Sequence, residues 1–507
     1  LASARDRALD WLMGRINYER TATVPYNQRQ LKLDRMRQLL VRLGQPDAGM
    51  KIVHVAGTKG KGSTSAMVAA MLTAAGYRTG VFSSPHLERI EERFVVDGEP
   101  CASDELVVLV DRLRPVVEAM DEDAARDGDS TAGPTYFEIT TAMALLHFVE
   151  RRVDVAVLEV GLGGRLDSTN VCLPMVSVIT SISFDHMKQL GNTLAAIARE
   201  KAGIIKPGVP VVCGASEPEA KAVIAEVARE HGCRLIQLGE DFTFQYQRSE
   251  SPVNNARQGD KACGELSRAE TRRQEDNSRV SPSPSLPLSP SNPPTGTVSF
   301  SHHVPGQEKR LTDIPLAMPG AHQAANAAVA LATIEELRYQ GWCISAGAMR
   351  MGLSRAALPG RIEIFTGDPT VILDAAHNPA SARALVAALA ELPTPSRRTL
   401  VLSVSHDKDV RAILRELAPH FDHFIITQYQ DNPRAVSAET LAAMMDELLA
   451  SRGLKAIVCP TPALAWEHVT QNATPGERIC ITGSFYLAAE MRPLVKKRAH
   501  EVPVPFK

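Results

Sequence analysis

The segment 57–64, Gly-Thr-Lys-Gly-Lys-Gly-Ser-Thr, constrains the fold of this chain more than any other. It follows an apolar run at 52–55 that predicts a buried strand, and it precedes a stretch at 63–75 that predicts a helix. Glycines let backbone N–H groups close around a phosphate, and the N-terminus of the next helix adds partial positive charge. The pattern predicts a phosphate-binding loop in an α/β fold; a flexible Gly/Lys turn is the plainer alternative.

The side chains of this loop are the first candidate ligands. Lys61 is long enough to reach the β- and γ-phosphates of a nucleotide. A standard P-loop places Ser or Thr directly after the lysine, whereas here Gly62 intervenes before Ser63. The residues predicted to bind the nucleotide are Gly57, Thr58, Gly60, Lys61, Gly62 and Ser63.

Short β-branched runs alternate with Ala/Leu-rich stretches along most of the chain. This alternation predicts mostly parallel sheets with helices on both faces. A chain of 507 residues is too long for one core. We therefore expect a P-loop ATPase-type domain over 1–355 and a smaller, Rossmann-like α/β domain over 356–507. The expected strands are 52–55, 79–82, 153–160, 176–182 and 209–212, then 371–373, 400–404, 424–427 and 478–482.

Residues 247–297 break this alternation, because they are polar and then rich in serine and proline. Proline removes backbone donors and excludes both helix and central strand. The composition predicts a disordered surface insertion in the first domain without a role in function; a functional tail is the alternative.

The composition excludes several classes of protein. With 44% hydrophobic and 22% charged residues and a net charge of −2, nothing points to a nucleic-acid or membrane-surface protein. The 8 cysteines show no CxxC spacing, which argues against a zinc or thioredoxin-like centre. Most stand in apolar contexts typical of reduced core residues in a cytoplasmic protein. No apolar run reaches transmembrane length, and the charged start of the chain is unlike a signal peptide.

Polar residues stand at the carboxyl ends of two predicted neighbouring strands, where open α/β sheets carry their ligands. Glu159 ends one apolar run and is followed by glycines. A carboxylate there is costly unless it is paired or binds metal, so Glu159 is a candidate Mg²⁺ ligand; a salt bridge to Arg165 is the alternative. Asp185 and His186 follow the next run, and this position favours a site residue over a structural histidine as the interpretation of His186.

Residues 191–203 predict a short helix that is capped by Asn192 or Thr193 and ends at Gly203. The plain interpretation of Lys201 is a cation that complements the helix C-terminus. Periodicity alone does not decide whether Lys201 has a further role.

Two later segments carry further candidates. On the Ala-rich helix that begins near residue 320, His322, Gln323 and Asn326 share one face, which suggests contact with a ligand such as an adenine edge. Capping and interdomain hydrogen bonds are the alternative. Charged residues also crowd a strand end in the second domain, where three side chains could reach across a cleft to the nucleotide: Arg361, Asp374 and His377.

Ten short strings, spread in order over nearly the whole chain, are GTKGKGS (57–63), SSPHL (83–87), LEVGLGGRLDSTN (158–170), DH (185–186), LGNTLAAIAREKAGIIK (190–206), GAHQAANAAVA (320–330), PGRIE (359–363), DAAHNP (374–379), NPRA (432–435) and TGSFYL (482–487). Taken together, these strings resemble folylpolyglutamate synthase/dihydrofolate synthase, a family of the Mur-ligase superfamily. Two features depart from the family pattern: Lys59 stands where asparagine is usual, and the insertion at 247–297 is absent from typical members.

The resemblance implies a set of site residues. Lys61, Lys201 and His377 would be catalytic, and Ser84, Glu159 and His186 would hold Mg²⁺. Lys201 matches a lysine that members carry as a carbamate, which would bind a second Mg²⁺. The remaining implied ATP contacts are Asn326, Arg361, Asp374 and His377.

The implied activity is ATP-dependent ligation of L-glutamate to dihydropteroate, to folates, or to both, in folate biosynthesis. A carboxylate is a poor electrophile, so phosphoryl transfer would first give an acyl phosphate, which the α-amine of glutamate then attacks. We expect ATP and two Mg²⁺ ions as cofactors, and a cytoplasmic monomer that binds neither nucleic acid nor membrane. The alternatives are another Mur-type amino-acid ligase, which the strings at 83–87 and 158–167 disfavour, and a non-catalytic P-loop module, which Asp374 and His377 disfavour.

Overall fold

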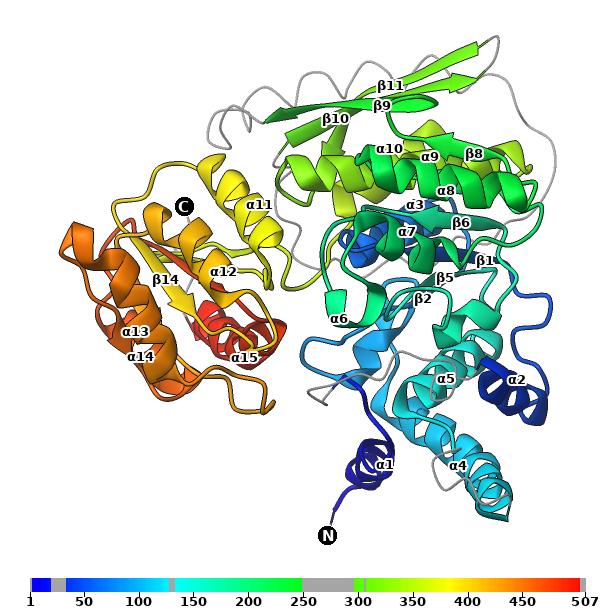
Figure 1. Cartoon of the computed structure of the whole chain (residues 1–507), viewed down its shortest axis with the longest axis horizontal. Coiled ribbons are helices and arrows are strands. Elements are labelled where there is room, and N and C mark those ends of the chain that lie inside the picture. The colour runs from blue at the N-terminus through cyan, green and yellow to red at the C-terminus, as the bar shows by residue number, and fades with distance from the viewer. Residues whose placement is uncertain (1, 20–32, 127–132, 249–295, 305–306, 502–507) are drawn as a thin grey trace.

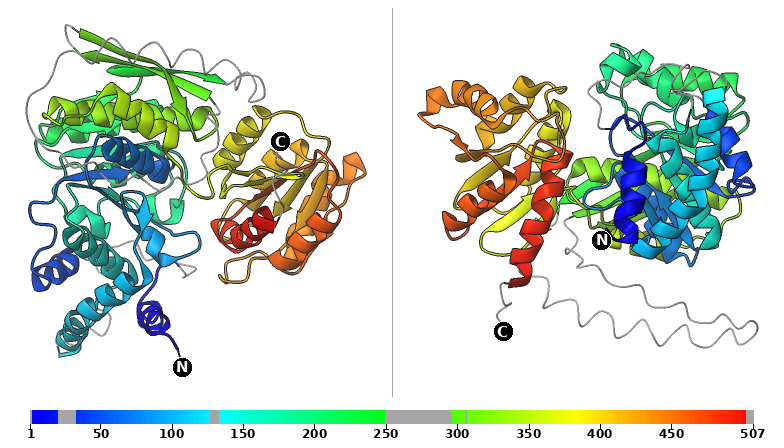
Figure 2. Two further views of the ribbon diagram at one scale, coloured as in Figure 1. Left: turned by 180° about the vertical axis from the view of Figure 1, so that it is seen from behind. Right: turned by 90° about the horizontal axis from the view of Figure 1, so that it is seen from below.

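The computed structural model describes residues 2–19, 33–126, 133–248, 296–304 and 307–501, which form two α/β lobes side by side (Figures 1 and 2). The larger lobe is built on an eight-stranded sheet in the order β4-β3-β2-β5-β1-β6-β7-β8. β3 and β4 are antiparallel, and the other six strands are parallel. The strands are β1 (Ile52–Ala56), β2 (Thr79–Phe82), β3 (Phe94–Val96), β4 (Glu99–Pro100), β5 (Val155–Glu159), β6 (Val176–Ile179), β7 (Val211–Cys213) and β8 (Leu235–Gln237).

Apolar side chains on both faces of this sheet explain why helices cover both. In β1, Val53 and Val55 pack on one face, whereas Ile52 packs on the other. The first face is covered by α3 (Lys61–Ala74), α9 (Ala321–Tyr339) and α10 (Ala346–Arg355). The second face is covered by α1 (Ala4–Met13), α2 (Leu33–Arg42), α4 (Ser103–Arg126) and α5 (Tyr136–Glu150). Three further helices lie beside β6 and β7: α6 (Met187–Leu190), α7 (Leu194–Ala202) and α8 (Pro218–Glu230).

A three-stranded antiparallel sheet of β9 (Phe242–Arg248), β10 (Gly296–Val304) and β11 (Gln307–Leu316) covers α9 at the top of Figure 1. Buried side chains such as Val298 and Phe300 join it to the core below. Residues 247–248 and 296–297 are therefore paired strand, and the predicted bounds of the insertion were too wide. Its remainder, 249–295, lies outside the described residues.

The register of β9 and β10 gives a test of the insertion. Arg248 and Gly296 are direct partners in the antiparallel ladder, so a tight turn can join them. Replacing residues 249–295 by Asn-Gly should keep kcat within about twofold and leave the melting temperature almost unchanged, because the removed segment has little apolar content. As a control, a deletion that also removes Val298 and Phe300 should destabilise the protein. Loss of the expected activity at normal stability would show that the insertion takes part in function.

The smaller lobe is a second doubly wound sheet, in the order β12-β13-β17-β14-β15-β16, with only β12 antiparallel. Side chains of β14 alternate between its two cores: Leu400 and Leu402 face α11, α12 and α13, whereas Val401 faces α14 and α15. The strands are β12 (Glu363–Phe365), β13 (Thr370–Leu373), β14 (Arg398–Leu402), β15 (His423–Ile426), β16 (Ile457–Val458) and β17 (Arg478–Thr482). The helices are α11 (Pro379–Ala390), α12 (Val410–Leu417), α13 (Ala438–Leu449), α14 (Pro462–Gln471) and α15 (Phe485–Glu501).

The predicted fold class, two α/β units with mostly parallel sheets, is confirmed. The exact division between 355 and 356 stays a prediction. Among the described helices, none combines the length and the apolar composition needed to cross a membrane. The seven cysteines within the described ranges are free thiols, and five of them are buried, as their apolar contexts predicted; Cys263 lies outside those ranges.

Candidate active site

The phosphate loop lies at the carboxyl end of β1 and opens α3, as the sequence predicted. Two of its glycines are required by geometry. Gly57 has φ 151° and Gly60 has φ 82°, conformations that L side chains rarely adopt. A Cβ at Gly57 would collide with Thr180, and one at Gly60 would collide with the Asn326 carboxamide. The loop is therefore packed directly against β6 and against the start of α9.

Hydrogen bonds hold this loop to the segment that follows β6. The Thr58 N–H donates to the Ser181 carbonyl at 2.7 Å, and the Thr180 hydroxyl donates to the Lys59 carbonyl at 2.6 Å. The Thr58 hydroxyl lies 3.2 Å from the Ser183 carbonyl. These bonds fix the loop backbone before any ligand arrives.

Lys61 stands in the first turn of α3 and faces the candidate metal ligands. Within the described part of the chain its ammonium makes no hydrogen bond or ion pair, although its charge acts on Glu159, His186 and Lys201. Those three side chains come from β5, from the segment after β6 and from α7. The charge of Lys61 thus acts on all three side chains, at the edge of the sheet where the sequence predicted a site.

Glu159 ends β5, is only 5% exposed and lies over the first turn of α3. A Cβ at Gly62 would lie 3.4 Å from its Oε2 atom. Burial raises the pKa of Glu159, while Lys61, Arg361 and the Ser84 N–H act in the opposite direction. The alternative partner Arg165 is wrong, because the Arg165 guanidinium binds Glu200 at 2.9 Å instead.

Lys201 points inward from the last turn of α7, whose predicted caps Thr193 and Gly203 are confirmed. It is 4% exposed, and its ammonium donates to the Gly57 carbonyl at 2.9 Å. Burial, together with the charge of the nearby Lys61, lowers the pKa of Lys201 to about 7. A surface cation at a helix end is therefore not what the structure shows.

His186 lies at the mouth of the same region, with its side chain 43% exposed. Desolvation against the surrounding protein lowers its pKa to about 4, and the charges of Lys408, Lys61 and Lys201 contribute in the same direction. An imidazole with a low pKa is neutral at physiological pH, the form that can coordinate a metal.

Asp185 connects the two lobes. Its carboxylate accepts from Lys408 Nζ at 3.2 Å and from Asn378 Nδ2 at 3.3 Å, and it lies 3.9 Å from His377 Nε2. Burial opposes ionisation of Asp185, yet Lys408 and the neighbouring histidines bring its pKa below the usual range. The site therefore includes residues of the smaller lobe.

Arg361 is the second link between the lobes. Its charge acts on Glu159 in the larger lobe and on Asp374 in its own. Asp374 is buried, and its oxygens accept the N–H groups of Ile362 at 2.9 Å and Ala376 at 2.8 Å. Asp374 therefore holds the backbone beside Arg361, and both hydrogen bonds stay within the smaller lobe.

Comparisons with known proteins show the family of this chain. The Mur ligase middle domain family matches residues 55–334, and the family described as Mur ligase, glutamate ligase domain matches residues 360–485. A dihydrofolate synthase/folylpolyglutamate synthase of Bacillus subtilis is 34% identical over 97% of this chain and 100% of its own length. The chain belongs to the folylpolyglutamate synthase/dihydrofolate synthase family of Mur ligases.

Solved structures of this family have the same fold. A Mycobacterium tuberculosis folylpolyglutamate synthase complexed with ADP superposes with a TM-score of 0.79 at 30% identity, over 97% of this chain and 98% of that one. E. coli FolC in complex with DHPP and ADP gives a TM-score of 0.73 at 29% identity, over 98% and 100% of the two chains.

Most of the predicted site residues lie together at one edge of the large sheet. Asn326 lies on α9 against Gly60, and its amide donates to Gln323 Oε1 at 3.0 Å. Ser84 follows β2 and reaches Glu159 through its N–H. His377 approaches from the smaller lobe.

Two important residues were missed by sequence reasoning. Asp185 was noted only as a strand-end residue, and Lys408 was not singled out. Lys408 follows β14, so the rule that polar residues at strand ends mark ligand sites could have found it. Lys59, the departure from the family pattern, points its buried ammonium into this region without a hydrogen bond among the described residues, and burial lowers its pKa to about 8.

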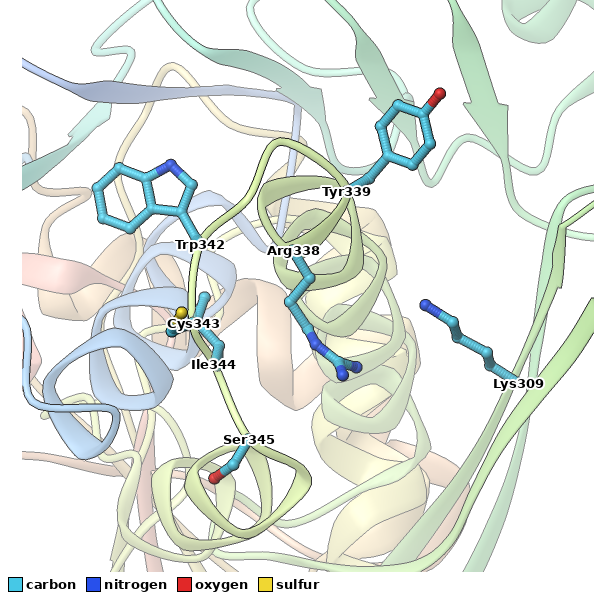
Figure 3. Close-up of a pocket in the computed structure, with 7 residues that line it drawn as sticks. All are labelled: Lys309, Arg338, Tyr339, Trp342, Cys343, Ile344 and Ser345. Carbon is cyan, nitrogen blue, oxygen red and sulfur yellow. The ribbon is translucent and has the colours of Figure 1, made fainter. Parts of the chain in front are cut away.

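A surface hollow elsewhere on the larger lobe contains none of the predicted residues (Figure 3). It lies at the far end of α9, where Arg338 is about 18 Å along the helix from Asn326. Its cations Lys309 and Arg338 are both paired with Glu335, at 3.1 and 2.5 Å. This hollow is therefore separate from the phosphate loop.

Proposed function

We propose that this chain is an ATP-dependent ligase that joins L-glutamate to dihydropteroate, to folates, or to both, through an acyl phosphate. The observation that carries the proposal is the contact of two lobes around one phosphate loop. Lys61, Glu159 and Lys201 meet at that loop, while from the smaller lobe the charge of Arg361 acts on Glu159 and His377 lies beside Asp185. The names of the relatives and the ADP bound in their structures support the same activity.

The roles follow from charge and position. Lys61 is placed to neutralise charge on the transferred phosphoryl group, and the loop N–H groups are placed to hold the phosphates. Asn326, next to Gly60, and Arg361 contact the nucleotide from two sides. The packed lobes exclude water that would hydrolyse the acyl phosphate before the glutamate amine attacks it.

The residues present fit Mg²⁺. Glu159 is a buried carboxylate whose known donor is a single N–H group, so it has lone pairs left for a cation. Ser84 adds a hydroxyl and His186 a neutral imidazole. Mg²⁺ held by these side chains would neutralise phosphate charge during the transfer.

We also propose that Lys201 is carbamylated. The Lys201 ammonium releases one proton, and the neutral amine then bonds to the carbon of CO₂ and releases a second proton, which turns a cation into a carbamate anion. The support is its burial beside Lys61, because two like charges in a desolvated site repel each other. A carbamate would pair with Lys61 and add an anionic ligand for a second Mg²⁺. Both the monomeric state and the cytoplasmic location stay predictions from the sequence.

The direct test of the proposed function is ADP release with ATP and Mg²⁺, measured with and without an acceptor plus glutamate. Dihydropteroate and tetrahydrofolate should be tried separately, and mass spectrometry should detect product heavier by one glutamyl residue. ADP release that needs both glutamate and an acceptor supports the ligase. Nucleotide binding without product from either acceptor would contradict it and favour a non-catalytic P-loop module.

The link between the lobes gives a further prediction. Lys408→Ala removes a charged hydrogen bond to Asp185, worth about 1.5–3 kcal/mol, so kcat/KM should fall by about tenfold or more. Steady-state ligase kinetics measure the effect, and Lys455→Ala serves as a control because Lys455 is an exposed lysine of the same lobe. Equal kinetics for the two variants would show that the Asp185 contact has no part in the reaction.

A further inference from the structure

Cys101, Glu105 and His147 form a cluster of metal-binding side chains outside the candidate active site. One donor atom from each, a sulfur, a carboxylate oxygen and a ring nitrogen, lies within 4.8 Å of the other two. Cys101 is 4% exposed, His147 is 2% exposed and Glu105 is half-buried. Cys101 and Glu105 are four residues apart, but His147 is distant in sequence, so no spacing motif predicts the cluster.

Three different elements bring the cluster together. Cys101 directly follows β4, where its N–H donates to the Phe94 carbonyl at 2.8 Å. Glu105 lies in the first turn of α4, and His147 lies in the last turn of α5. The end of α5 leads toward the amino end of β5, whereas the phosphate loop follows the carboxyl end of β1. The cluster therefore lies away from the nucleotide site.

The His147 ring is open to a ligand. No hydrogen bond to either ring nitrogen occurs within the described ranges, and neither nitrogen is among the fully buried polar atoms that lack a partner, so the ring keeps some contact with solvent although the residue is only 2% exposed. A metal ion beside Cys101 can therefore bind one of these nitrogens.

The donor set selects the metal. Thiolate, imidazole and carboxylate together are typical Zn²⁺ ligands, whereas Mg²⁺ and Ca²⁺ prefer oxygen alone. Tetrahedral Zn²⁺ with bonds of about 2.0–2.3 Å separates its ligand atoms by roughly 3.3–3.8 Å. The cluster thus needs to contract by about 1 Å, which rotation of partly exposed Glu105 can provide. Glu105 also pairs with Arg151 at 3.1 Å, but the Arg151 side chain is 45% exposed and free to turn toward solvent.

We propose that Cys101, Glu105 and His147 form a site for one Zn²⁺ ion, with water as the fourth ligand. The ion joins the strand β4 to α4 and α5, so its role is to stabilise this side of the larger lobe. Zn²⁺ binding takes the proton from the Cys101 thiol and releases it to solvent, with no change of oxidation state. This inference is independent of the proposed ligase activity.

Co²⁺ is the probe that separates this site from the nucleotide site, because thiolate coordination gives a near-ultraviolet charge-transfer band. The full-length protein would be titrated with Co²⁺ in excess Mg²⁺, and Zn²⁺ would then be added to displace it. Cys101→Ala is compared with Cys172→Ala, because both cysteines are buried in the same core and neither change adds a charge. Wild type and Cys172→Ala should show the band at one Co²⁺ per chain, and Cys101→Ala should not.

Glu105→Gln covers the case in which Cys101→Ala fails to fold, because the change is isosteric and the side chain is partly exposed. Its affinity for Zn²⁺, measured by calorimetry, should fall by more than the about 10–100-fold that loss of an outer-shell partner costs. The matched control is Glu150→Gln, since Glu150 lies on α5 but pairs with Arg112 outside the cluster. Three results would overturn the proposal: no band in wild type, a band that persists in Cys101→Ala, or equal Zn²⁺ affinity of the two glutamine variants.

Discussion

Lys201→Arg should be nearly inactive as a ligase while keeping the positive charge of the native side chain. The guanidinium stays protonated and does not form a carbamate, so the site would lack the proposed anion. If the native side chain acted only as a cation beside the Gly57 carbonyl, arginine would preserve much of the activity. Ligase turnover under saturating ATP, acceptor and glutamate measures the difference.

Arginine is larger than lysine and the site is buried, so two further measurements separate chemistry from packing. Lys201→Ala should also be nearly inactive, but short-chain carboxylic acids in solution should partly restore it by filling the vacated anionic position. Lys206→Arg is the matched control, because Lys206 is a half-buried lysine just beyond α7 that binds the Asn170 carbonyl. It should retain most of its turnover. An active Lys201→Arg enzyme would defeat the carbamate proposal.

Lys61→Ala should lower kcat by about 10²–10³-fold, the usual effect of removing one preorganised donor to transition-state charge. The melting temperature should hardly change, because Lys61 makes no hydrogen bond or ion pair within the described ranges. Ligase kinetics together with a thermal melt test both parts of this prediction.

The control for Lys61 is Lys51→Ala, since Lys51 is an exposed lysine just before β1. Its kinetics should equal those of the unmodified chain. If Lys61→Ala turns over at nearly the native rate, Lys61 is not a catalytic residue. A large fall in its melting temperature would instead indicate a structural role.

Local sequence patterns were enough to predict nine of the described strands and the phosphate loop. β17 and β2 have the predicted bounds, the other seven predicted strands differ by one to three residues at their ends, and the remaining eight described strands were not predicted. These features depend on local patterns: β-branched runs, Ala-rich helical stretches, and glycines where the backbone must turn. The caps Thr193 and Gly203 were readable for the same reason, because capping involves only near neighbours.

Which side chains meet at the site depends on how the whole chain folds. Lys201 reaches a carbonyl 144 positions earlier in the chain, and Lys408 reaches Asp185 across 223 positions. Arg165, six residues after Glu159 in the sequence, instead pairs with Glu200. The Zn²⁺ cluster combines Cys101 and Glu105 with a histidine on another helix. Such contacts depend on strand order and on how helices pack over the sheet, and a local pattern carries no information about either. The burial of the site residues and the charges around them therefore follow only from the folded chain.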